Sequence, residues 1–344
     1  MTRLKISYSL TRRPSQSRMA AAYMDIISAD HELVSTQDTA DIVVVHHPPR
    51  NYETVYALHP ALQNRYVISC CVPHAEDVPS LWQRNLRRVQ EVWTPSEFCR
   101  RALSSYHPNV VVVPYVIERD MSVSAEARTG VARMIAFDPG LVYFLTLGSL
   151  DEPRKNIPTL VETFMRVSGS MPDARLIVKS AATDVPSWAP HSQIIFLPLQ
   201  MPLDYVSALY ELSTIYVSAH HAEGWGLAIS DAMLFGKPVI ATEYSGNLEY
   251  MTAENSFPLR WKEGEVANIP RPGIGVEPGT RWAEPDRDHL AELLLHLYQS
   301  YDQALVQDRA RCASEDLRHF SREAAAQVIR QRINEISQRI PGKR

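Results

Sequence analysis

Short apolar runs alternate with amphipathic segments along most of the chain. The apolar runs, which we expect to be strands, fall into two series: 4–8, 41–47, 65–72, 92–93 and 110–114, and then 141–147, 174–179, 194–197, 214–219 and 239–242. Continuous apolar strands are typical of parallel sheets covered by helices on both faces, and antiparallel strands alternate more often. The two series therefore predict two α/β domains with parallel sheets.

The segments between the strands give the expected helices and boundaries. Helices are expected over 81–89, 98–103, 158–167, 288–301 and 322–340. Thr94-Pro95-Ser96-Glu97 has the form of a capping box before the second of these helices. Residues 118–140 lose periodicity and 260–278 are rich in proline and glycine, so we expect a linker and an irregular loop. The predicted division is 1–125, 126–320 and a C-terminal helix in 321–344 that crosses back to the first domain.

Composition narrows the class of protein. The apolar share is 45% and the net charge is −4, which suits a protein with a real core and excludes a global basic surface for nucleic acid. No run approaches the ~20 apolar residues of a membrane span, and the N-terminus lacks the apolar core of a signal peptide. The four cysteines have no metal-ligand spacing. We therefore expect a cytoplasmic protein with reduced thiols.

A glycine loop follows the apolar run 214–219. It contains Glu223, Gly224 and Gly226, and an apolar, helix-like segment with Asp231 comes directly after it. Glycines let the backbone approach a ligand, and the amides at a helix N-terminus can donate to phosphate or sugar oxygens. Two carboxylates eight residues apart could hold two ends of an elongated ligand. The alternative is that Glu223 is an ordinary loop acid and Asp231 a solvated helix residue.

A second polar loop follows the apolar run 141–147. It contains Asp151, Glu152, Arg154 and Lys155. Two adjacent cations between a strand and a helix suit a diphosphate, whose charge grows as a leaving group departs. The alternative is a solvated loop in which the cations pair with the neighbouring acids.

Together these segments resemble the retaining GT-B glycosyltransferases of family 4, the glycosyl transferases group 1 type. The stretch from Glu223 to Asp231 resembles that family's E-x7-E motif, with aspartate in the second place. Arg154-Lys155-Asn156 is similar to its phosphate-clamping loop, and 243–247 to the loop that meets the donor sugar and diphosphate. Segments 92–98, 112–116 and 281–286 and the final helix also fit. The resemblance covers about residues 90–340 well and 1–90 loosely.

The resemblance implies a GT-B fold, with two Rossmann-like domains whose parallel sheets face each other across a cleft. It implies a retaining, metal-independent hexosyltransferase that uses a UDP- or GDP-sugar, no other cofactor, and a glycan or lipid-linked acceptor, in bacterial surface polysaccharide or glycoconjugate assembly. Implied catalytic residues are Glu223 on the sugar hydroxyls, Arg154 and Lys155 on the diphosphate, and His74 near the reacting carbon. Implied donor-binding residues are Asp231 on the ribose, Gly224, Gly226, Leu227, Ser245, Gly246, Asn247, Gly148 and Lys179.

Several alternatives stay open. His46, His47 and Glu76 compete with His74, and any of these histidines could instead be structural. Asp231 is one methylene shorter than the family's glutamate, 9–17 contains no glycine, and the acceptor half is short. A GT-B phosphorylase or a non-catalytic GT-B partner subunit therefore remain alternative functions.

Two charge patterns are also present. The arginines at 84, 87, 88, 100 and 101 are expected to form a solvated face, or a surface for a lipid-linked acceptor or a membrane. Asp286-Arg287-Asp288 spells D-x-D, but its position before a helix predicts an N-cap and not a metal site.

Overall fold

The computed structural model describes residues 3–10, 14–118, 121–181, 191–267 and 276–340. The chain divides into two compact units. Unit 1 comprises Met1–Glu118, Gly275–Thr280 and Arg318–Arg344, and unit 2 comprises Arg119–Ile274 and Arg281–Leu317. The C-terminal helix therefore belongs to unit 1. The short segment Gly275–Thr280, which precedes the last strand of unit 2, also belongs to unit 1.

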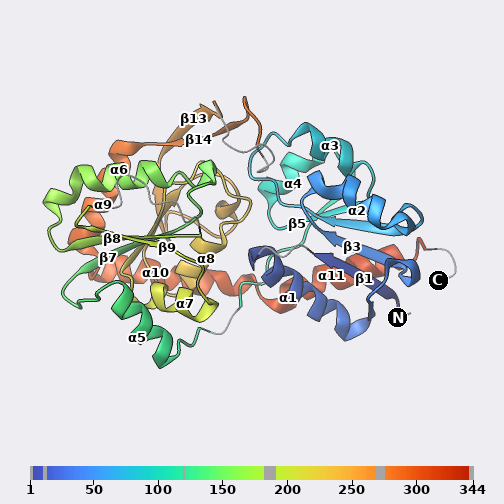
Figure 1. Cartoon of the computed structure of the whole chain (residues 1–344), viewed down its shortest axis with the longest axis horizontal. Helices are drawn as coiled ribbons and strands as arrows, with labels where there is room; N and C mark the ends of the chain where they lie inside the picture. The colour runs from blue at the N-terminus through green and yellow to red at the C-terminus, as the bar shows by residue number, and fades with distance from the viewer. Residues whose placement is uncertain (1–2, 11–13, 119–120, 182–190, 268–275, 341–344) are drawn as a thin grey trace. The chain divides into compact units, whose positions relative to one another are not determined.

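Unit 1 is built on a parallel sheet that, over the described residues, has six strands in the order β2-β1-β3-β4-β5-β6. The strands are β1 Lys5–Leu10, β2 Glu32–Val34, β3 Ile42–His46, β4 Tyr66–Cys70, β5 Glu91–Thr94 and β6 Val110–Val112. The helices are α1 Pro14–Asp30, α2 Tyr52–Leu58, α3 Ser80–Leu86, α4 Glu97–Ser104 and α11 Arg322–Ser337. Helix α11 packs against α1 (Figure 1), and its Ala325, Ile329, Ile333 and Ile336 are buried.

Unit 2 repeats the architecture. In the described part of this unit, six parallel strands follow the order β12-β11-β10-β7-β8-β9. They are β7 Val142–Leu147, β8 Ala174–Ser180, β9 Ile194–Pro198, β10 Ile215–Ser218, β11 Val239–Thr242 and β12 Phe257–Leu259. The helices are α5 Ala125–Met134, α6 Ile157–Val167, α7 Leu203–Leu212, α8 Leu227–Leu234, α9 Arg287–Ser300 and α10 Ala304–Asp316. An antiparallel hairpin joins β13 Trp261–Glu265 to β14 Arg281–Pro285.

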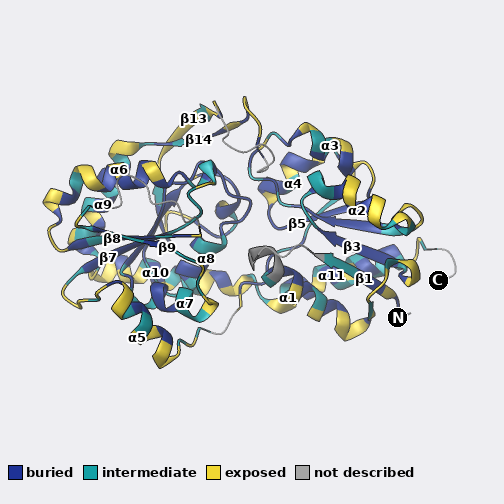
Figure 2. Cartoon of the chain, in the orientation of Figure 1, coloured by how far each residue is buried: buried dark blue, intermediate teal, exposed yellow. Residues whose placement is uncertain are grey.

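Burial accounts for the unbroken apolar pattern of the strands. Every residue of β3, β5, β10 and β11 is buried, and helices such as α6 and α9 present one buried and one exposed face (Figure 2). In unit 2, Phe144 of β7 and Leu176 of β8 pack with Phe164 of α6 and Leu294 of α9 in one core. The predicted α/β class with parallel sheets is confirmed, because strands buried on both faces need helices above and below them.

Four local predictions differ from the structure. The cap of α4 is Ser96, whose Oγ accepts from the Cys99 amide, and not Thr94. Helix α5 lies within the expected linker 118–140, and β13 lies within the expected loop 260–278, of which 268–275 is outside the described residues. Helices α2, α7 and α10 form where no helix was expected. Asp286 caps α9 as predicted, since its Oδ1 accepts from the amides of Asp288 and His289.

Candidate active site

Three loops of unit 2 meet at the carboxyl edge of its sheet. They follow β7, β10 and β11, and β10 lies between the other two strands. The loop after β7 forms a single turn at Pro153–Lys155, the loop after β10 leads into α8, and the loop after β11 forms a turn at Gly246–Glu249. The carboxyl ends of parallel strands are where open α/β sheets bind ligands, so the topology puts these loops in the right place for a site.

Glu223 is the centre of this cluster. Its Oε2 accepts a hydrogen bond of 2.8 Å from Arg154 Nη1, and its Oε1 accepts one from Lys155 Nζ. Arg154 Nη2 also donates to Glu152 Oε2 at 2.5 Å. Glu223 is 5% exposed and Arg154 9% exposed, so the ion pairs are screened little by solvent. The two loops that were expected to act on a ligand therefore hold each other by buried charge.

Burial alone would raise the pKa of Glu223, because it disfavours the charged carboxylate. The charges of Arg154 and Lys155 outweigh that effect, and the net result is a pKa well below the usual value for a glutamate. Glu223 is thus an anion across the physiological range, and it acts as a hydrogen-bond acceptor and not as a proton donor.

Two buried donors at the same edge are left without an acceptor among the described residues. They are Nε of Arg154 and Nδ2 of Asn156. Asn156 has a left-handed backbone with φ of 49°, which turns the chain sharply from the Arg154–Lys155 turn into α6. Buried donors normally find partners, so such atoms at a helix N-terminus point to an anion as the missing acceptor.

The glycine loop and the loop after β11 are in direct backbone contact. The amide of Gly246 donates to the carbonyl of Glu223 at 2.8 Å, and a Cβ on Gly246 would lie 2.1 Å from the carbonyl oxygen of Gly224. Ser245, at φ of 79°, accepts the Glu223 amide on its Oγ at 2.8 Å. Gly226 has φ of 86° at the start of α8, a conformation that favours glycine. These contacts fix the position of Glu223.

Asp231 lies on α8 in the same buried neighbourhood as Glu223. It is 6% exposed, so it is not the solvated helix residue of the alternative interpretation. The pKa values of Tyr216 and Tyr250 are raised first by burial and then by the negative charges of Glu223 and Asp231. Each tyrosine is thus close enough to Glu223 and Asp231 for both charges to raise its pKa. Leu227 is the first residue of α8, at the helix N-terminus.

Asn247 and His220 form part of the framework, a role that was not predicted from the sequence. Asn247 Nδ2 donates to the Thr242 carbonyl at 2.9 Å, and its Oδ1 lies 3.1 Å from His220 Nε2. His220 Nδ1 lies 3.0 Å from Ser218 Oγ, and burial lowers the pKa of His220 to about 4. The side chain of Asn247 is therefore committed to holding two loops together. Adjacent histidines after a buried strand are the only sequence signal of this link.

Gly148 and Lys179 lie beside the cluster. The Gly148 amide donates to the Lys179 carbonyl at 3.1 Å, and a Cβ on Gly148 would meet Lys155 Cγ at 3.2 Å. Lys179 is half-buried, and this burial lowers its pKa. Gly148 thus gives the side chain of Lys155 room to reach Glu223.

The N-terminal candidates all lie in unit 1. His74 follows β4 in a loop and is half-buried, and Glu76 in the same loop is exposed. His46, at the end of β3, is 1% exposed, bonds Tyr8 through Nδ1 at 2.9 Å and has a pKa lowered by burial to about 4. His47 lies 3.1 Å from Ser9 Oγ through Nε2. His46 is a core residue, whereas His74 is more accessible.

No cluster of three or more His, Cys, Asp or Glu side chains suitable for a metal ion occurs within the described ranges. The same part of the chain has no helix that is long and apolar enough to cross a membrane.

Comparisons with known proteins agree with this geometry. Residues 142–269 match the family described as Glycosyl transferases group 1, and that segment includes all three loops. No curated protein has a statistically significant sequence match to this chain.

Solved structures match over nearly the whole chain. HepE from Anabaena in complex with UDP and glucose is 14% identical, with a TM-score of 0.69 over 96% of this chain and 100% of that one. A glycosyltransferase from Rickettsia africae is 13% identical, with a TM-score of 0.68 over 99% and 100% of the chains. Sucrose-phosphate synthase from Thermosynechococcus elongatus is 14% identical, with a TM-score of 0.64 over 95% and 80%. The fold is GT-B, and the family match and fold together support a glycosyltransferase.

Proposed function

We propose that the chain is a retaining, metal-independent glycosyltransferase of family 4, which moves a hexose from a UDP- or GDP-sugar to a glycan or lipid-linked acceptor. The observation that carries the proposal is the buried cluster of Glu223, Arg154 and Lys155 at the carboxyl edge of unit 2. An arginine, a lysine and two buried donors without acceptors there suit a diphosphate. The HepE structures, one with UDP-glucose and one with UDP, support a nucleotide sugar as the ligand class.

The proposed roles follow from the contacts. Arg154 and Lys155 bind the diphosphate and stabilise its growing negative charge as the sugar leaves. Glu223, held as an anion, accepts hydrogen bonds from hydroxyls of the transferred sugar. Asp231 binds the ribose hydroxyls. The other proposed donor-site contacts come from the backbone of Gly148, Gly224, Gly226, Leu227, Ser245, Gly246 and Asn247, and from Lys179.

The proposed mechanism is attack of the acceptor on the same face from which the diphosphate leaves. Two cations and the loop amides supply the electrostatic stabilisation that a divalent metal supplies in other sugar transferases. The acceptor is proposed to bind unit 1, with His74 as the side chain that faces the reacting carbon. We further propose that the enzyme is cytoplasmic and acts in bacterial surface polysaccharide assembly. Unit 1 would make its peripheral contact with the membrane.

The direct test is release of nucleoside diphosphate. The protein is incubated with a panel of UDP- and GDP-sugars, with and without candidate acceptor sugars, and free UDP or GDP is measured. We expect release from one donor class, stimulated by an acceptor and independent of a metal chelator. Sugar transfer only to inorganic phosphate would indicate a phosphorylase, and no release with any pair would favour a non-catalytic subunit. Either result would overturn the proposal.

A further inference from the structure

An open pocket of about 450 Å³ lies in unit 1, away from the carboxyl edge of its sheet. Its walls come from the amino ends of neighbouring strands: Tyr66 begins β4, Gln90 immediately precedes β5, and Asn109 immediately precedes β6. Arg87 after α3, Tyr106 after α4 and Arg339 after α11 complete it. The proposed donor and acceptor sites use carboxyl edges, so this pocket is separate from both.

The floor of the pocket is held by hydrogen bonds between its loops. His107 Nε2 donates to the Val89 carbonyl at 3.2 Å, and His107 Nδ1 accepts the Asn109 amide at 3.1 Å. Asn109 Nδ2 donates to the Gln90 carbonyl at 3.1 Å, and Gln90 Oε1 accepts the amide of Val67 at 2.7 Å. Among the described residues no hydrogen bond engages Asn109 Oδ1 or Gln90 Nε2, so both atoms are open to a ligand. The floor of the pocket is therefore held in place by the fold.

The charge of the pocket is positive. Arg87 and Arg339 are exposed and form no ion pair with any described residue, and no acidic side chain lines the pocket. Glu91 accepts a hydrogen bond from the Tyr66 hydroxyl. The charge of Glu91 is neutralised by Arg332, which donates to it at 3.1 and 2.6 Å. Glu335, one turn before Arg339, pairs with Arg332 and also feels the charge of Arg339. A guanidinium that lines a pocket and forms no ion pair can still bind an oxyanion with paired hydrogen bonds.

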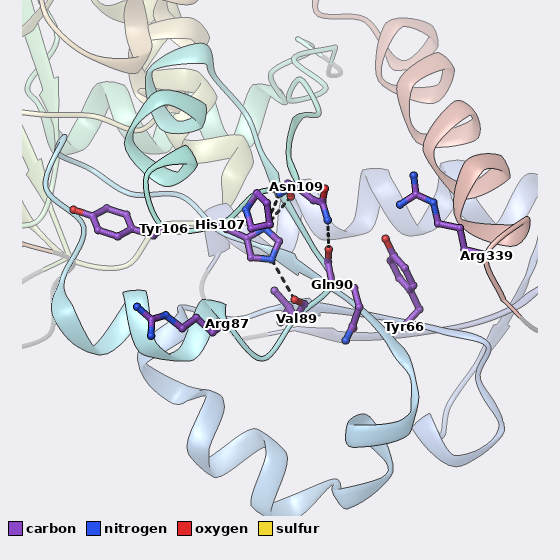
Figure 3. A pocket seen from close by; sticks show the side chains of 9 residues that line it. Tyr66, Arg87, Val89, Gln90, Tyr106, His107, Asn109 and Arg339 are labelled. Carbon is purple, nitrogen blue, oxygen red and sulfur yellow. Dashed lines mark hydrogen bonds between the residues drawn. The ribbon is translucent and has the colours of Figure 1, made fainter.

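The other side chains indicate the body of the ligand. Figure 3 shows Tyr106 and Arg87 on one side of the floor formed by Val89, Gln90, His107 and Asn109, with Tyr66 and Arg339 on the other. Tyrosine rings offer flat apolar faces with a polar end, and carboxamides can bond hydroxyl groups as donor and acceptor. The volume lies within the ~300–1,000 Å³ of small-molecule sites. We propose that this pocket binds a saccharide that carries an oxyanion, either a phosphate or a carboxylate.

The test is a calorimetric titration of the full chain at fixed ionic strength with glucose 6-phosphate, glucuronate, glucose and inorganic phosphate. We expect saturable binding of at least one anionic sugar, and binding of glucose and inorganic phosphate that is about tenfold weaker or more. The comparison of glucose 6-phosphate with glucuronate distinguishes the two oxyanions. Arg87 and Arg339 lie on opposite sides of the floor (Figure 3), so one of them holds the oxyanion: either Arg87→Gln or Arg339→Gln should weaken that binding about tenfold, and no weakening in either variant would overturn the proposal.

Two control variants make the result specific. Arg101→Gln removes the same charge from an exposed position of α4 outside the pocket, and Lys155→Ala alters the donor site of unit 2. Neither should weaken binding of the anionic sugar. The proposal is overturned by the absence of saturable binding, by equal weakening in Arg101→Gln, by loss of binding in Lys155→Ala, or by inorganic phosphate binding as tightly as the sugars. A failure of the donor-site proposal would leave these outcomes unchanged.

Discussion

Each carboxylate oxygen of Glu223 has a partner within the protein. Arg154 and Lys155 hold it, and the Ser245 hydroxyl and the Gly246 amide fix its backbone. A bound diphosphate would share the two cations and free part of the carboxylate for sugar hydroxyls. The ion pairs thus fix the carboxylate and the two cations in place, which is the preorganisation that electrostatic catalysis needs.

Replacement of Glu223 by glutamine tests this role. The amide would keep the size of the side chain but lose the negative charge, so we expect turnover to fall on the order of 100-fold. The affinity for UDP or GDP should not weaken, because the cations keep their charge and lose a competitor. Steady-state kinetics and calorimetry measure the two effects. The exposed Glu254→Gln serves as the control, and full activity of Glu223→Gln would remove Glu223 from the mechanism.

Gly246→Ala tests the contact between the two loops. The new Cβ would lie 2.1 Å from the carbonyl oxygen of Gly224, so one loop must move. We expect a loss of stability of about 1–3 kcal/mol and a UDP affinity weakened at least about tenfold. Gly169→Ala is the matched control, because nothing lies within 4 Å of a Cβ at that position. Thermal unfolding and UDP titration that showed no difference between the two variants would contradict the described contact.

The sequence predicts a glycine loop beside a ligand from Glu223-Gly224-Trp225-Gly226 alone, because glycines on both sides of a bulky residue let the backbone approach a ligand next to a carboxylate. It does not predict that Gly246 must be glycine for packing. That requirement arises only when the loops after β10 and β11 meet across the sheet, and it depends on tertiary contacts. The ion pair between Glu223 and Arg154 also depends on tertiary contacts, because the two residues are 69 positions apart. Local sequence patterns therefore do not predict it.

At the scale of elements, hydrogen bonds between loops hold the site. The amide of His221 donates to the Arg154 carbonyl at 2.8 Å. The imidazole ring of His221 stacks on Trp282 of β14, with ring centroids 4.0 Å apart. His220 links the end of β10 to Asn247. Three strand ends and the hairpin are thus connected through two adjacent histidines.

His220 predicts a stability that depends on pH. Its pKa in the folded chain is about 4. The usual value of about 6.5 applies when the chain unfolds, so the unfolded state takes up the proton first as the pH falls. The stability that neutral His220 contributes is complete above about pH 6.5 and is lost between about pH 6.5 and 4, by ~2 kcal/mol at pH 5.

Urea denaturation of the wild type and of His220→Gln at pH 7 and pH 5 measures this contribution. The wild type should lose more stability than the variant between the two values, whereas the exposed His319→Gln should behave like the wild type. An identical pH dependence in wild type and His220→Gln would show that His220 does not stay neutral in the folded chain.

Strands were more predictable than short peripheral elements. Strands β7 and β10 are buried on both faces, so their sequences are apolar at nearly every position and stand out from their surroundings. Strand β13, in contrast, has four exposed residues and one half-buried residue, and shows no apolar alternation. Helix α10 buries only Val306, Ala310 and Ala313, which is too narrow a face for the pattern to stand out.

At the scale of the whole molecule, the chain returns to its first unit at its end. Glu91 of β5 is fully buried and accepts hydrogen bonds from Tyr66, Trp93 and Arg332 of α11. The residues of the ion pair between Glu91 and Arg332 are 241 positions apart. This ion pair connects α11 to the sheet of unit 1.

Arg332→Gln should destabilise the protein by about 3–5 kcal/mol, because it leaves a buried carboxylate without its counter-charge. Arg330→Gln, on the same helix, removes an exposed ion pair with Asp30 and should have a much smaller effect. Thermal and urea unfolding of the two variants measure the difference. Equal destabilisation would mean that the buried pair with Glu91 does not hold α11 to unit 1.

Lys155 and its neighbours in unit 2 are proposed to bind a nucleoside diphosphate. The most direct measurement is calorimetric titration of UDP and GDP into the wild type, Lys155→Ala and Lys262→Ala, the last being an exposed lysine on β13. We predict saturable binding of one nucleotide, weakened about tenfold or more in Lys155→Ala and unchanged in Lys262→Ala. Binding of neither nucleotide by the folded wild type, or equal affinity in Lys155→Ala, would show that Lys155 does not hold a nucleoside diphosphate.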